Sequence, residues 1–473
     1  MNSEEEFIST FKPALEVLND HIESGNIVRI ITHSDADGIA AGGILCRMVS
    51  RLGAGFKTTC EKKVDVKVLQ EVAAEKPSIV IFSDLGSGYL DIIGKHLDSD
   101  VIILDHHHPI EADAPEITHV NPILQGIDGA RSISGAGITY LFSRLVDEDN
   151  IDLSPLGIVG ALADQQDKGE RQTLLGLNKS IEKNATDSGM LETKVDLIMY
   201  GYETRPLARA LAYTTTPFIP GLSGREDKCI ALFKSAGIGL KKGGRWRALR
   251  DLSEEEKRAL FSALSKHLLS EGCNSDVVYE LIGTIYTLTK EEAWTPVRDG
   301  REYASLLNAC ARMERPSLGL AICLGDRETA MDEAEKTLED YRKNIAEYLD
   351  WVREGGRIEE MENIYTLPAE GNIDDRLIGV IASILLSTGI LKKPKPIVAW
   401  ALTEEGLIKV SARATEDLAR RGIDLGIVMM DAAEKFQGRG GGHDIAAGAF
   451  LPEELGEEFL DLVDVLVGEQ NDY

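Results

Sequence analysis

Acidic residues and histidines gather in four short segments of the first 170 residues. They are Thr32–Gly38 (THSDADG), Ser83–Gly88 (SDLGSG), Asp105–His108 (DHHH) and Ala163–Asp167 (ADQQD). Carboxylates combined with imidazoles suit Mn²⁺ or a similar first-row metal better than Mg²⁺ alone. Two such cations about 3.5–4 Å apart can clamp the attacking and leaving oxygens of a phosphodiester. The residue types therefore indicate a two-metal hydrolytic site.

Each segment taken alone also has an ordinary structural explanation. An Asp-x-Asp-Gly string such as Asp35–Gly38 is usually a turn, and a residue placed like Asp84 is often a helix N-cap. The histidine run can be an exposed loop. Asp164, at the end of the apolar stretch LGIVGALAD, can be a surface residue. The four segments together, in this order and each at an expected strand or helix end, favour the metal site.

Strands and helices alternate around the first three segments. Short apolar runs predict strands over Ile27–Thr32, Ser78–Phe82 and Val101–Leu104, and helices are expected over Ile39–Leu52 and Tyr89–Leu97. This alternation predicts a parallel sheet with helices on both faces. Because ligands collect at the carboxyl ends of parallel strands, we expect the four loops to converge on one crevice.

The pattern changes between residues 176 and 301, where helical and charge-rich segments dominate. Leu252–Leu269 is the clearest predicted helix, and Ser253 with Glu256 is expected to form a capping box at its start. The stretch Lys241–Arg250 (KKGGRWRALR) is the one dense basic cluster and contains Trp246. It is either a solvated loop leading into a helix or a patch that contacts phosphate or a partner.

An α/β pattern returns from residue 302. We expect strands over Leu318–Leu324, Ile397–Leu402 and Leu407–Ser411, with a charged helix over Asp332–Trp351 between the first two. The glycine-rich run Gly438–Gly442 follows and directly precedes a histidine. These features predict a separate C-terminal domain.

Composition restricts the class of protein. The net charge of −28 argues against nonspecific coating of nucleic acid, but it allows a nuclease with a locally basic groove and bound cations. No apolar run approaches the roughly 18–20 residues of a membrane span. The start, MNSEEEFIST, lacks the basic and apolar regions of a signal peptide. We therefore expect a cytoplasmic protein without a membrane partner.

At the acidic and histidine segments the sequence resembles the DHH phosphoesterase superfamily, which is named for the Asp-His-His seen here as residues 105–107. More narrowly, it looks like an archaeal RecJ-type exonuclease of the GINS-associated nuclease group. The resemblance covers almost the whole chain. Its motifs are Asp35–Gly38, Ser83–Gly88, Leu104–His107, Ala163-Asp164, Leu306–Ala309, Gly319 to Asp326 and Gly440–Gly448.

The resemblance implies an α/β fold in three parts. A parallel-sheet DHH catalytic domain is expected over residues 1–175, a helical middle linker or insertion over 176–301, and a smaller α/β DHH-associated substrate-binding domain over 302–473. The two α/β domains are expected to face each other across a cleft. A narrow cleft would admit one strand and exclude duplex without reading bases.

The resemblance also implies two Mn²⁺ ions, with Mg²⁺ or Co²⁺ as alternatives. Residues matching Asp35 and Asp84 hold one ion, and residues matching Asp37, Asp84, His106 and Asp164 hold the other, so that Asp84 bridges. The expected catalytic residues are His107 and Asp105, and His107 would face the scissile phosphate. Many relatives have a histidine at the position of Ile31, and the chain departs from them there. We assign His33 as a ligand of the first ion, and treat the extra histidine, His108, as a spectator.

The C-terminal glycine-rich motif is suited to phosphate, because glycine amides can approach an anion closely. His443 adds a hydrogen-bond donor, and the guanidinium of Arg413 can bind a backbone phosphate through two hydrogen bonds. Each has a structural alternative, a packed histidine or a surface ion pair. The expected substrate-binding residues are Ser411, Arg413, Gly440, Gly441, Gly442, His443, Arg312 and Arg376.

The function most strongly implied is an exonuclease that acts on single-stranded DNA, and also on RNA, and frees mononucleotides in the 5′→3′ direction. Its expected partners are the GINS complex and the replicative helicase, in replication or repair. One alternative is a phosphodiesterase for oligoribonucleotides or cyclic dinucleotides, although such relatives generally lack the helical middle. Another is a non-catalytic replisome scaffold like the RecJ-related eukaryotic helicase cofactor, which has lost metal ligands that this chain keeps.

Overall fold

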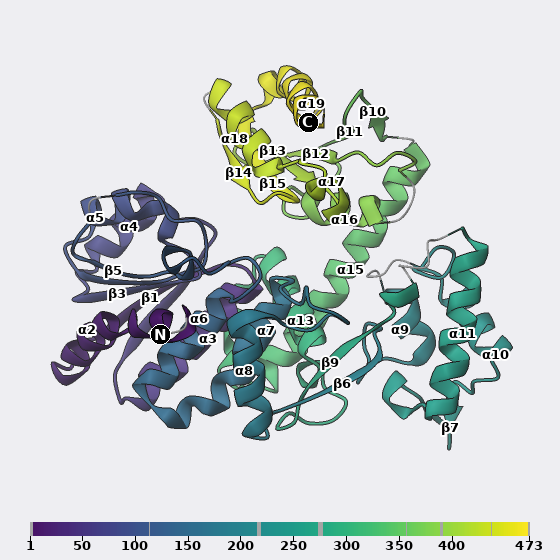
Figure 1. Cartoon of the computed structure of the whole chain (residues 1–473), viewed down its shortest axis with the longest axis horizontal. Coiled ribbons are helices and arrows are strands. Elements are labelled where there is room, and N and C mark those ends of the chain that lie inside the picture. The colour runs from purple at the N-terminus through teal and green to yellow at the C-terminus, as the bar shows by residue number, and fades with distance from the viewer. Residues whose placement is uncertain are drawn as a thin grey trace. The chain divides into compact units, whose positions relative to one another are not determined.

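The computed structural model describes residues 3–112, 114–214, 219–272, 278–355, 357–387, 391–436 and 438–471. The chain forms two compact units, Met1–Leu211 with Cys229–Glu339, and Ala212–Lys228 with Asp340–Tyr473 (Figure 1). Over the described residues, no helix combines the length and the apolar character that crossing a membrane requires.

A five-stranded, fully parallel sheet forms the core of the first unit, with strand order β2-β1-β3-β4-β5. The strands are β1 (Val28–His33), β2 (Phe56–Glu61), β3 (Ile79–Ser83), β4 (Asp100–Leu104) and β5 (Ile117–Val120). The three strands predicted from the sequence are confirmed as β1, β3 and β4, and they are neighbours. The outer strands β2 and β5 were not predicted, because their burial is only partial and their patterns are weak.

Helices cover both faces of this sheet, as expected. On one face Ile30, Ile81 and Ile102 pack against α2 (Lys12–Glu23), α3 (Ala36–Arg51) and α6 (Gly135–Val146). On the other face the alternate strand residues pack against α4 (Val66–Ala74) and α5 (Leu90–His96). Because both faces are buried, β3 and β4 are nearly continuous apolar runs rather than alternating ones, whereas β1 also carries the buried Arg29 and Thr32.

A layer of helices packs around α3 and includes one correction. The helices are α7 (Ser154–Ala163), α13 (Gly300–Arg312) and α14 (Pro316–Cys323). The strand expected over Leu318–Leu324 is wrong, since these residues belong to α14 and its end. Pro316 occupies the first turn of this helix, and Gly319 lets it approach Ile39 of α3. A short apolar run does not distinguish a strand from a buried helix by its pattern alone.

The middle of the chain is mainly helical, with α8 (Gly176–Asp187), α9 (Leu207–Tyr213), α10 (Glu226–Ser235) and α11 (Glu254–Ser270). The expected capping box is present: the Ser253 hydroxyl accepts from the Glu256 N–H at 3.3 Å, and the Glu256 carboxylate accepts from the Ser253 N–H at 2.9 Å. An antiparallel pair of long strands, β6 (Leu191–Leu197) and β9 (Ile282–Leu288), was not predicted. Its partners lie too far apart in sequence to be paired by pattern.

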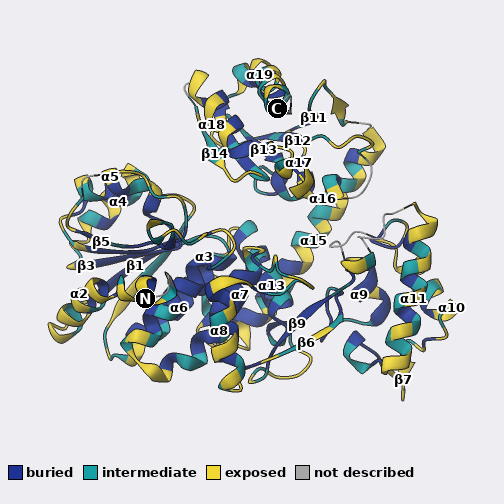
Figure 2. Ribbon diagram, in the orientation of Figure 1, coloured by how far each residue is buried: buried dark blue, intermediate teal, exposed yellow. Residues whose placement is uncertain are grey.

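The second unit contains a six-stranded mixed sheet, with strand order β10-β11-β12-β13-β15-β14. Apolar clusters lie on each face of it, and Figure 2 shows the buried residues concentrated there. The predicted strands over 397–402 and 407–411 are confirmed as β12 and β13. Helix α15 (Thr329–Gly355) begins in the first unit and enters the second at Asp340. The elements that follow are β10 (Glu359–Glu360), β11 (Tyr365–Glu370), α16 (Ile378–Ser387), β12 (Ile397–Leu402), β13 (Leu407–Arg413), α17 (Glu416–Arg420), α18 (Leu425–Lys435), β14 (Arg439–Gly442), β15 (Ala446–Pro452) and α19 (Gly456–Asn471).

Candidate metal centre

The carboxyl ends of three neighbouring strands present most of the predicted metal ligands. β1 ends at His33, β3 is followed by Asp84, and β4 is followed by Asp105. Asp35 is the N-cap of α3, and its carboxylate accepts from the Gly38 N–H at 2.9 Å. Asp164 is the C-cap residue of α7. Because β1, β3 and β4 are adjacent, His33, Asp84 and Asp105 meet at one edge of the sheet although they are far apart in the sequence.

His33, Asp35 and Asp84 form one group of possible metal ligands. The His33 Nδ1 atom lies 3.0 Å from Asp35 Oδ2 and 3.3 Å from Asp84 Oδ2. Two carboxylates and an imidazole within this distance of one another make a ligand set that a first-row divalent cation accepts.

Asp37, His106 and Asp164 form a second group. The His106 Nε2 atom lies 3.9 Å from both Asp37 Oδ2 and Asp164 Oδ2. The same nitrogen lies 3.1 Å from Asp84 Oδ1. Asp84 thus presents Oδ2 to the first group and Oδ1 to the second, which is the arrangement that a bridging carboxylate requires.

The atoms of Asp84 fit a cation better than they fit the surrounding protein. Its side chain is 1% exposed, and its two oxygens face His33 Nδ1 at 3.3 Å and His106 Nε2 at 3.1 Å without well-aligned hydrogen bonds. His33 Nδ1 is also buried, and it faces Asp35 Oδ2 and Asp84 Oδ2 without well-aligned hydrogen-bond geometry. Burying a charged group without such partners is costly, and coordination to divalent cations would supply the missing interactions.

The backbone of Asp84 adds a second sign of functional constraint. Its φ of 60° lies in the left-handed region, which residues other than glycine seldom occupy. Backbone strain of this kind concentrates at functional sites. Here the turn after β3 directs the carboxylate back between the two ligand groups.

Excess negative charge in the cluster perturbs its acids. Burial raises the pKa of Asp37, and the charges of Asp84 and Asp164 raise it further. Burial and the charge of Asp84 also raise the pKa of Asp164, although His106 opposes that shift. Burial alone would lower the pKa of His106, but the surrounding carboxylates raise it well above its ordinary value. Divalent cations would relieve this repulsion.

The hydrogen bonding of His106 prepares it as a ligand. Its Nδ1 donates to the carbonyl oxygen of Gly129 at 2.7 Å. In the neutral ring, which is the form that binds a metal, the lone pair is therefore on the other nitrogen, Nε2, which faces the carboxylates. A backbone partner of this kind fixes the orientation and tautomer of a metal-binding histidine.

Two glycines, which the sequence analysis did not single out, make room for the carboxylates. The N–H groups of Gly135 and Ala136, at the start of α6, donate to Asp37 Oδ2 at 2.7 Å and Oδ1 at 3.0 Å. A Cβ on Gly135 would lie 2.4 Å from Asp84 Oδ1, and one on Gly160 would lie 2.1 Å from Asp37 Oδ1. The string SISGAG before an apolar helix was the available signal for the first of them.

Gln166 was also missed. Its side-chain amide donates to Asp164 Oδ2 and to the Gly129 carbonyl, both at 2.9 Å. It therefore connects the predicted ligand Asp164 to the same carbonyl that orients His106. The motif ADQQD contains this residue, but only its acids were predicted to be functional.

Asp105 lies beside the ligand groups and orients the next residues. It accepts hydrogen bonds from the N–H groups of Ser87 at 2.9 Å and His106 at 2.8 Å, and from His107 Nδ1 at 2.8 Å. His107 is 39% exposed, and its Nδ1 lies 4.0 Å from Asp84 Oδ1. Burial opposes protonation of His107, but the charge of Asp105 raises its pKa above the ordinary value. Asp105 can therefore hold His107 in place and favour its protonated form.

Two residues of the same segments lie apart from the cluster. Asp167 forms an ion pair with Arg301, and His108 is exposed. Neither belongs to a group of described residues able to hold a metal.

Seven of the eight expected substrate-binding residues lie in the second unit, and Arg312 lies on α13 in the first. Ser411 and Arg413 are on β13, and the Arg413 guanidinium donates to the Ser383 hydroxyl at 3.1 Å. Arg376 is paired with Asp374. The remaining four residues form β14 and the start of the turn into β15: Gly440, Gly441, Gly442 and His443.

Glycine is required along β14 for two reasons. Gly441 and Gly442 have φ values of 154° and 144°, which favour glycine. A Cβ on Gly440 would lie 2.2 Å from the carbonyl oxygen of Met429 on α18. His443 follows at an exposed turn, where its N–H donates to the Ala446 carbonyl at 2.9 Å.

Three domain families match consecutive parts of the chain. The N-terminal domain of the DHH family matches residues 27–161, the DHH-CID domain matches 199–282, and the DHHA1 domain matches 364–469. An uncharacterized protein of Methanocaldococcus jannaschii is 33% identical over 450 residues, which cover 94% of each chain.

Two solved structures have the same fold. RecJ of Thermus thermophilus, solved with Mn²⁺ and separately with Mg²⁺, is 17% identical, with a TM-score of 0.60 for the Mn²⁺ form. That match covers 97% of this chain but 55% of the RecJ chain, so this protein spans about half the length of that relative. CDC45 of Entamoeba histolytica is 13% identical, with a TM-score of 0.65 and coverage of 98% of this chain and 99% of CDC45.

Proposed function

Because the chain belongs to the DHH superfamily and is RecJ-like in its domains and fold, we propose that it is a metal-dependent exonuclease. Its substrate would be single-stranded DNA, and also RNA, from which it releases mononucleotides in the 5′→3′ direction. The observation that carries this proposal is Asp84, which presents one buried oxygen to each of two ligand groups.

The residues present fit two divalent cations. His33, Asp35 and Asp84 would hold one, and Asp37, Asp84, His106 and Asp164 the other. When bound, two Mn²⁺, Mg²⁺ or Co²⁺ ions would supply positive charge to the phosphodiester and activate a water for attack.

The chain's own residues orient the substrate and move protons. His107, held by Asp105 through Nδ1, has its Nε2 available to donate to a nonbridging phosphate oxygen or to protonate the leaving oxygen. The raised pKa of His107 favours the protonated form that such donation needs. Asp37 is fixed by two backbone N–H groups, so its position does not depend on the substrate.

We assign the strand's phosphates to the second unit. The open glycine backbone of β14 and the turn at His443 can approach an anion closely. Arg413 supplies a positive charge at the end of β13, and β13 and β14 both pair with β15. Because phosphate contacts carry no sequence information, binding through phosphates would let the protein act on strands of any base sequence.

The test compares wild type with Asp84→Ala on end-labelled single-stranded DNA and RNA, in Mn²⁺, Mg²⁺ or EDTA. We expect Mn²⁺-dependent release of mononucleotides, abolished by EDTA and reduced at least about 100-fold in Asp84→Ala, because a ligand shared by both ions is lost. Asp91→Ala, on the exposed surface of α5, is the matched control. Labels at the two ends report the direction, and release from the 3′ end would overturn the proposed polarity.

A scaffold function in replication is the second candidate, and the CDC45-like fold favours it. If the protein is a scaffold without catalytic activity, the wild type should cleave neither DNA nor RNA in any of the metals tested. Cleavage of short oligoribonucleotides or cyclic dinucleotides alone would instead favour the small-substrate phosphodiesterase.

We also propose that the chain binds the GINS complex, and through it the replicative helicase, by its middle segment. The resemblance to GINS-associated nucleases supports this assignment. A pull-down with purified GINS tests it, and undiminished recovery of GINS by a chain without the middle segment would contradict it.

A further inference from the structure

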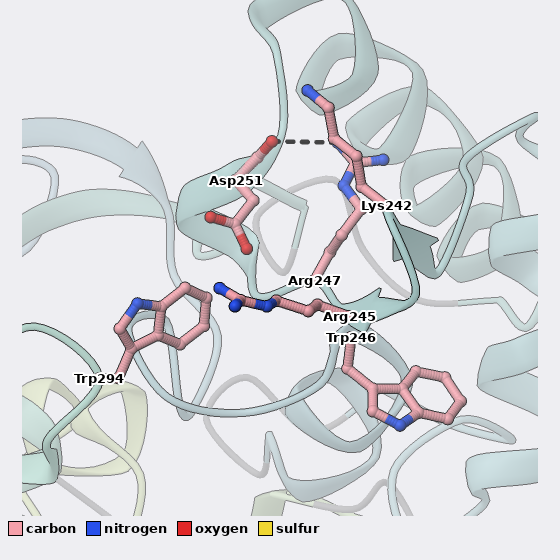
Figure 3. Close-up of a pocket in the computed structure, with 6 residues that line it drawn as sticks. All are labelled: Lys242, Arg245, Trp246, Arg247, Asp251 and Trp294. Carbon is pink, nitrogen blue, oxygen red and sulfur yellow. Dashed lines mark hydrogen bonds between the residues drawn. The ribbon is translucent and has the colours of Figure 1, made fainter.

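A basic and aromatic pocket lies in the middle of the chain, within the first unit. A short hairpin, β7 (Lys241–Lys242) and β8 (Arg245–Trp246), forms one side of it. The pocket has a volume of about 540 Å³, a size that suits one small ligand or one unit of a polymer. Its lining, drawn in Figure 3, consists of Lys242, Arg245, Trp246, Arg247, Asp251 and Trp294.

Two cations of the hairpin are available to an anion. Lys242 and Arg245 are directly opposite each other in the strand register, and like charges in that arrangement destabilise a strand pair. The Arg245 guanidinium forms no hydrogen bond or ion pair with any described residue, and in Figure 3 its side chain points toward Trp294. An anion between the two cations would remove their repulsion.

The other charged groups of the lining are occupied. Arg247 is buried and donates to the Glu256 carboxylate at 2.7 and 2.5 Å, to the Gly239 carbonyl at 3.0 Å and to the Asp251 carbonyl at 3.0 Å. The Asp251 carboxylate accepts from the Ala248 N–H at 2.9 Å. These contacts fix the hairpin against α11. The Glu256 carboxylate, whose charge also acts on Lys242, is already paired with Arg247.

Two tryptophans at the pocket are about half exposed, Trp246 at 53% and Trp294 at 50%. A cation lies over each ring: Lys241 Nζ is 4.2 Å from the Trp246 centroid, and Arg250 Cζ is 5.1 Å from that of Trp294. Trp294 has a φ of 73°, a strained value for a bulky residue. The fold therefore accepts a strained backbone in order to present an indole at the surface, which is typical of a ligand-binding position.

We propose that this pocket binds single-stranded nucleic acid, with an unpaired base stacked on an exposed indole and a phosphate held by Lys242 and Arg245. Indoles combined with unpaired cations are the components of sequence-tolerant single-strand binding. An acidic peptide would use the cations but has no need of two exposed indoles. The site shares no residue with the metal centre. It goes beyond the proposed exonuclease activity, although it takes the same class of substrate.

The test measures binding of fluorescein-labelled oligo-dT to the full chain in EDTA, by anisotropy and by quenching of tryptophan fluorescence. Trp294→Gly removes the indole while suiting the left-handed backbone, so it should weaken binding about tenfold or more without lowering the melting temperature. Arg245→Glu should weaken binding by a similar factor. Lys266→Glu, an exposed charge reversal on α11, is the matched control and should have a smaller effect than Arg245→Glu.

The outcomes separate this inference from the proposed function. Unchanged affinity in both Trp294→Gly and Arg245→Glu would overturn the site. Polyglutamate that displaces oligo-dT from wild type and binds Trp294→Gly equally well would assign the pocket to an acidic protein and would also overturn it. Loss of binding in both variants would support it even if wild type cleaves no strand, because EDTA removes any contribution from cleavage.

Discussion

Asp84 shows most clearly how single residues determine this site. Its carboxylate is buried and lacks well-aligned hydrogen bonds in the described structure, and its backbone is strained. In the absence of cations, the His33 and His106 rings, 3.3 and 3.1 Å from its oxygens, compensate this charge only in part, because Asp37 and Asp164 add further negative charge to the cluster. The same features place one oxygen toward each ligand group.

The first prediction concerns stability. Asp84→Asn removes one negative charge from a cluster in which the carboxylates repel one another, so the metal-free variant should be more stable than metal-free wild type, by on the order of 1–3 kcal/mol. Added Mn²⁺ should raise the melting temperature of wild type and have much less effect on the variant. Thermal denaturation with EDTA and with Mn²⁺ measures both effects. A variant less stable than wild type in EDTA would show that Asp84 contributes to folding by itself.

The second prediction concerns Gly160. A Cβ there would lie 2.1 Å from Asp37 Oδ1, so Gly160→Ala should displace this ligand and weaken Mn²⁺ affinity about 10- to 100-fold. Gly157→Ala on the same helix is the matched control, since its nearest neighbour would be 3.3 Å away. Isothermal titration calorimetry with Mn²⁺ compares the affinities of the two variants. Equal affinities would contradict the assignment of Asp37 as a ligand.

At the scale of elements, the start of α13 carries an acidic pair that is separate from the metal centre. Asp299 caps the helix and accepts from the N–H groups of Arg301 and Glu302 at 2.9 and 3.0 Å. Burial, followed by the charge of Asp299, raises the pKa of Glu302 to about 8. Burial raises the pKa of Asp299 to about 6.

A pH dependence follows from this pair. The folded state keeps a proton on Glu302 that the unfolded state has already released above its ordinary pKa near 4.5. Folding stability should therefore fall as pH rises from about 5 to about 8. Glu302→Gln removes this titration, so its melting temperature should fall less over the same range. Parallel melting curves across that range for the two proteins would contradict the prediction.

At the scale of the whole molecule, the net charge of −28 decides how a polyanionic strand can bind. The overall charge repels such a strand at long range, so we expect binding to depend on a few local cations and on bound metal. We predict a shallow salt dependence: the slope of log K against log salt for oligo-dT should lie between about −1 and −3, because each single-strand phosphate contact contributes about −0.7. A slope as steep as about −6 would indicate an extensive basic groove instead.

The sequence by itself indicated the chemistry and determined much of the local structure. Continuous apolar runs identified β1, β3 and β4, because parallel strands buried on both faces need no alternation. The residue types of the four segments indicated carboxylate and imidazole ligands before any geometry was known. Ser253 and Glu256 identified the start of α11, since a capping box depends on residues only three positions apart.

Only the tertiary structure decided which atoms meet. The strand order placed Asp84 between His33 and His106, and no pattern in the sequence states which oxygen faces which nitrogen. Gly135 and Gly160 matter because of close approaches between distant segments. Residues 318–323 became a helix because of their packing on α3, and β6 paired with β9 across about 90 residues. Residue types and short-range patterns can be read directly from the sequence, whereas contacts between distant segments exist only once the chain has folded.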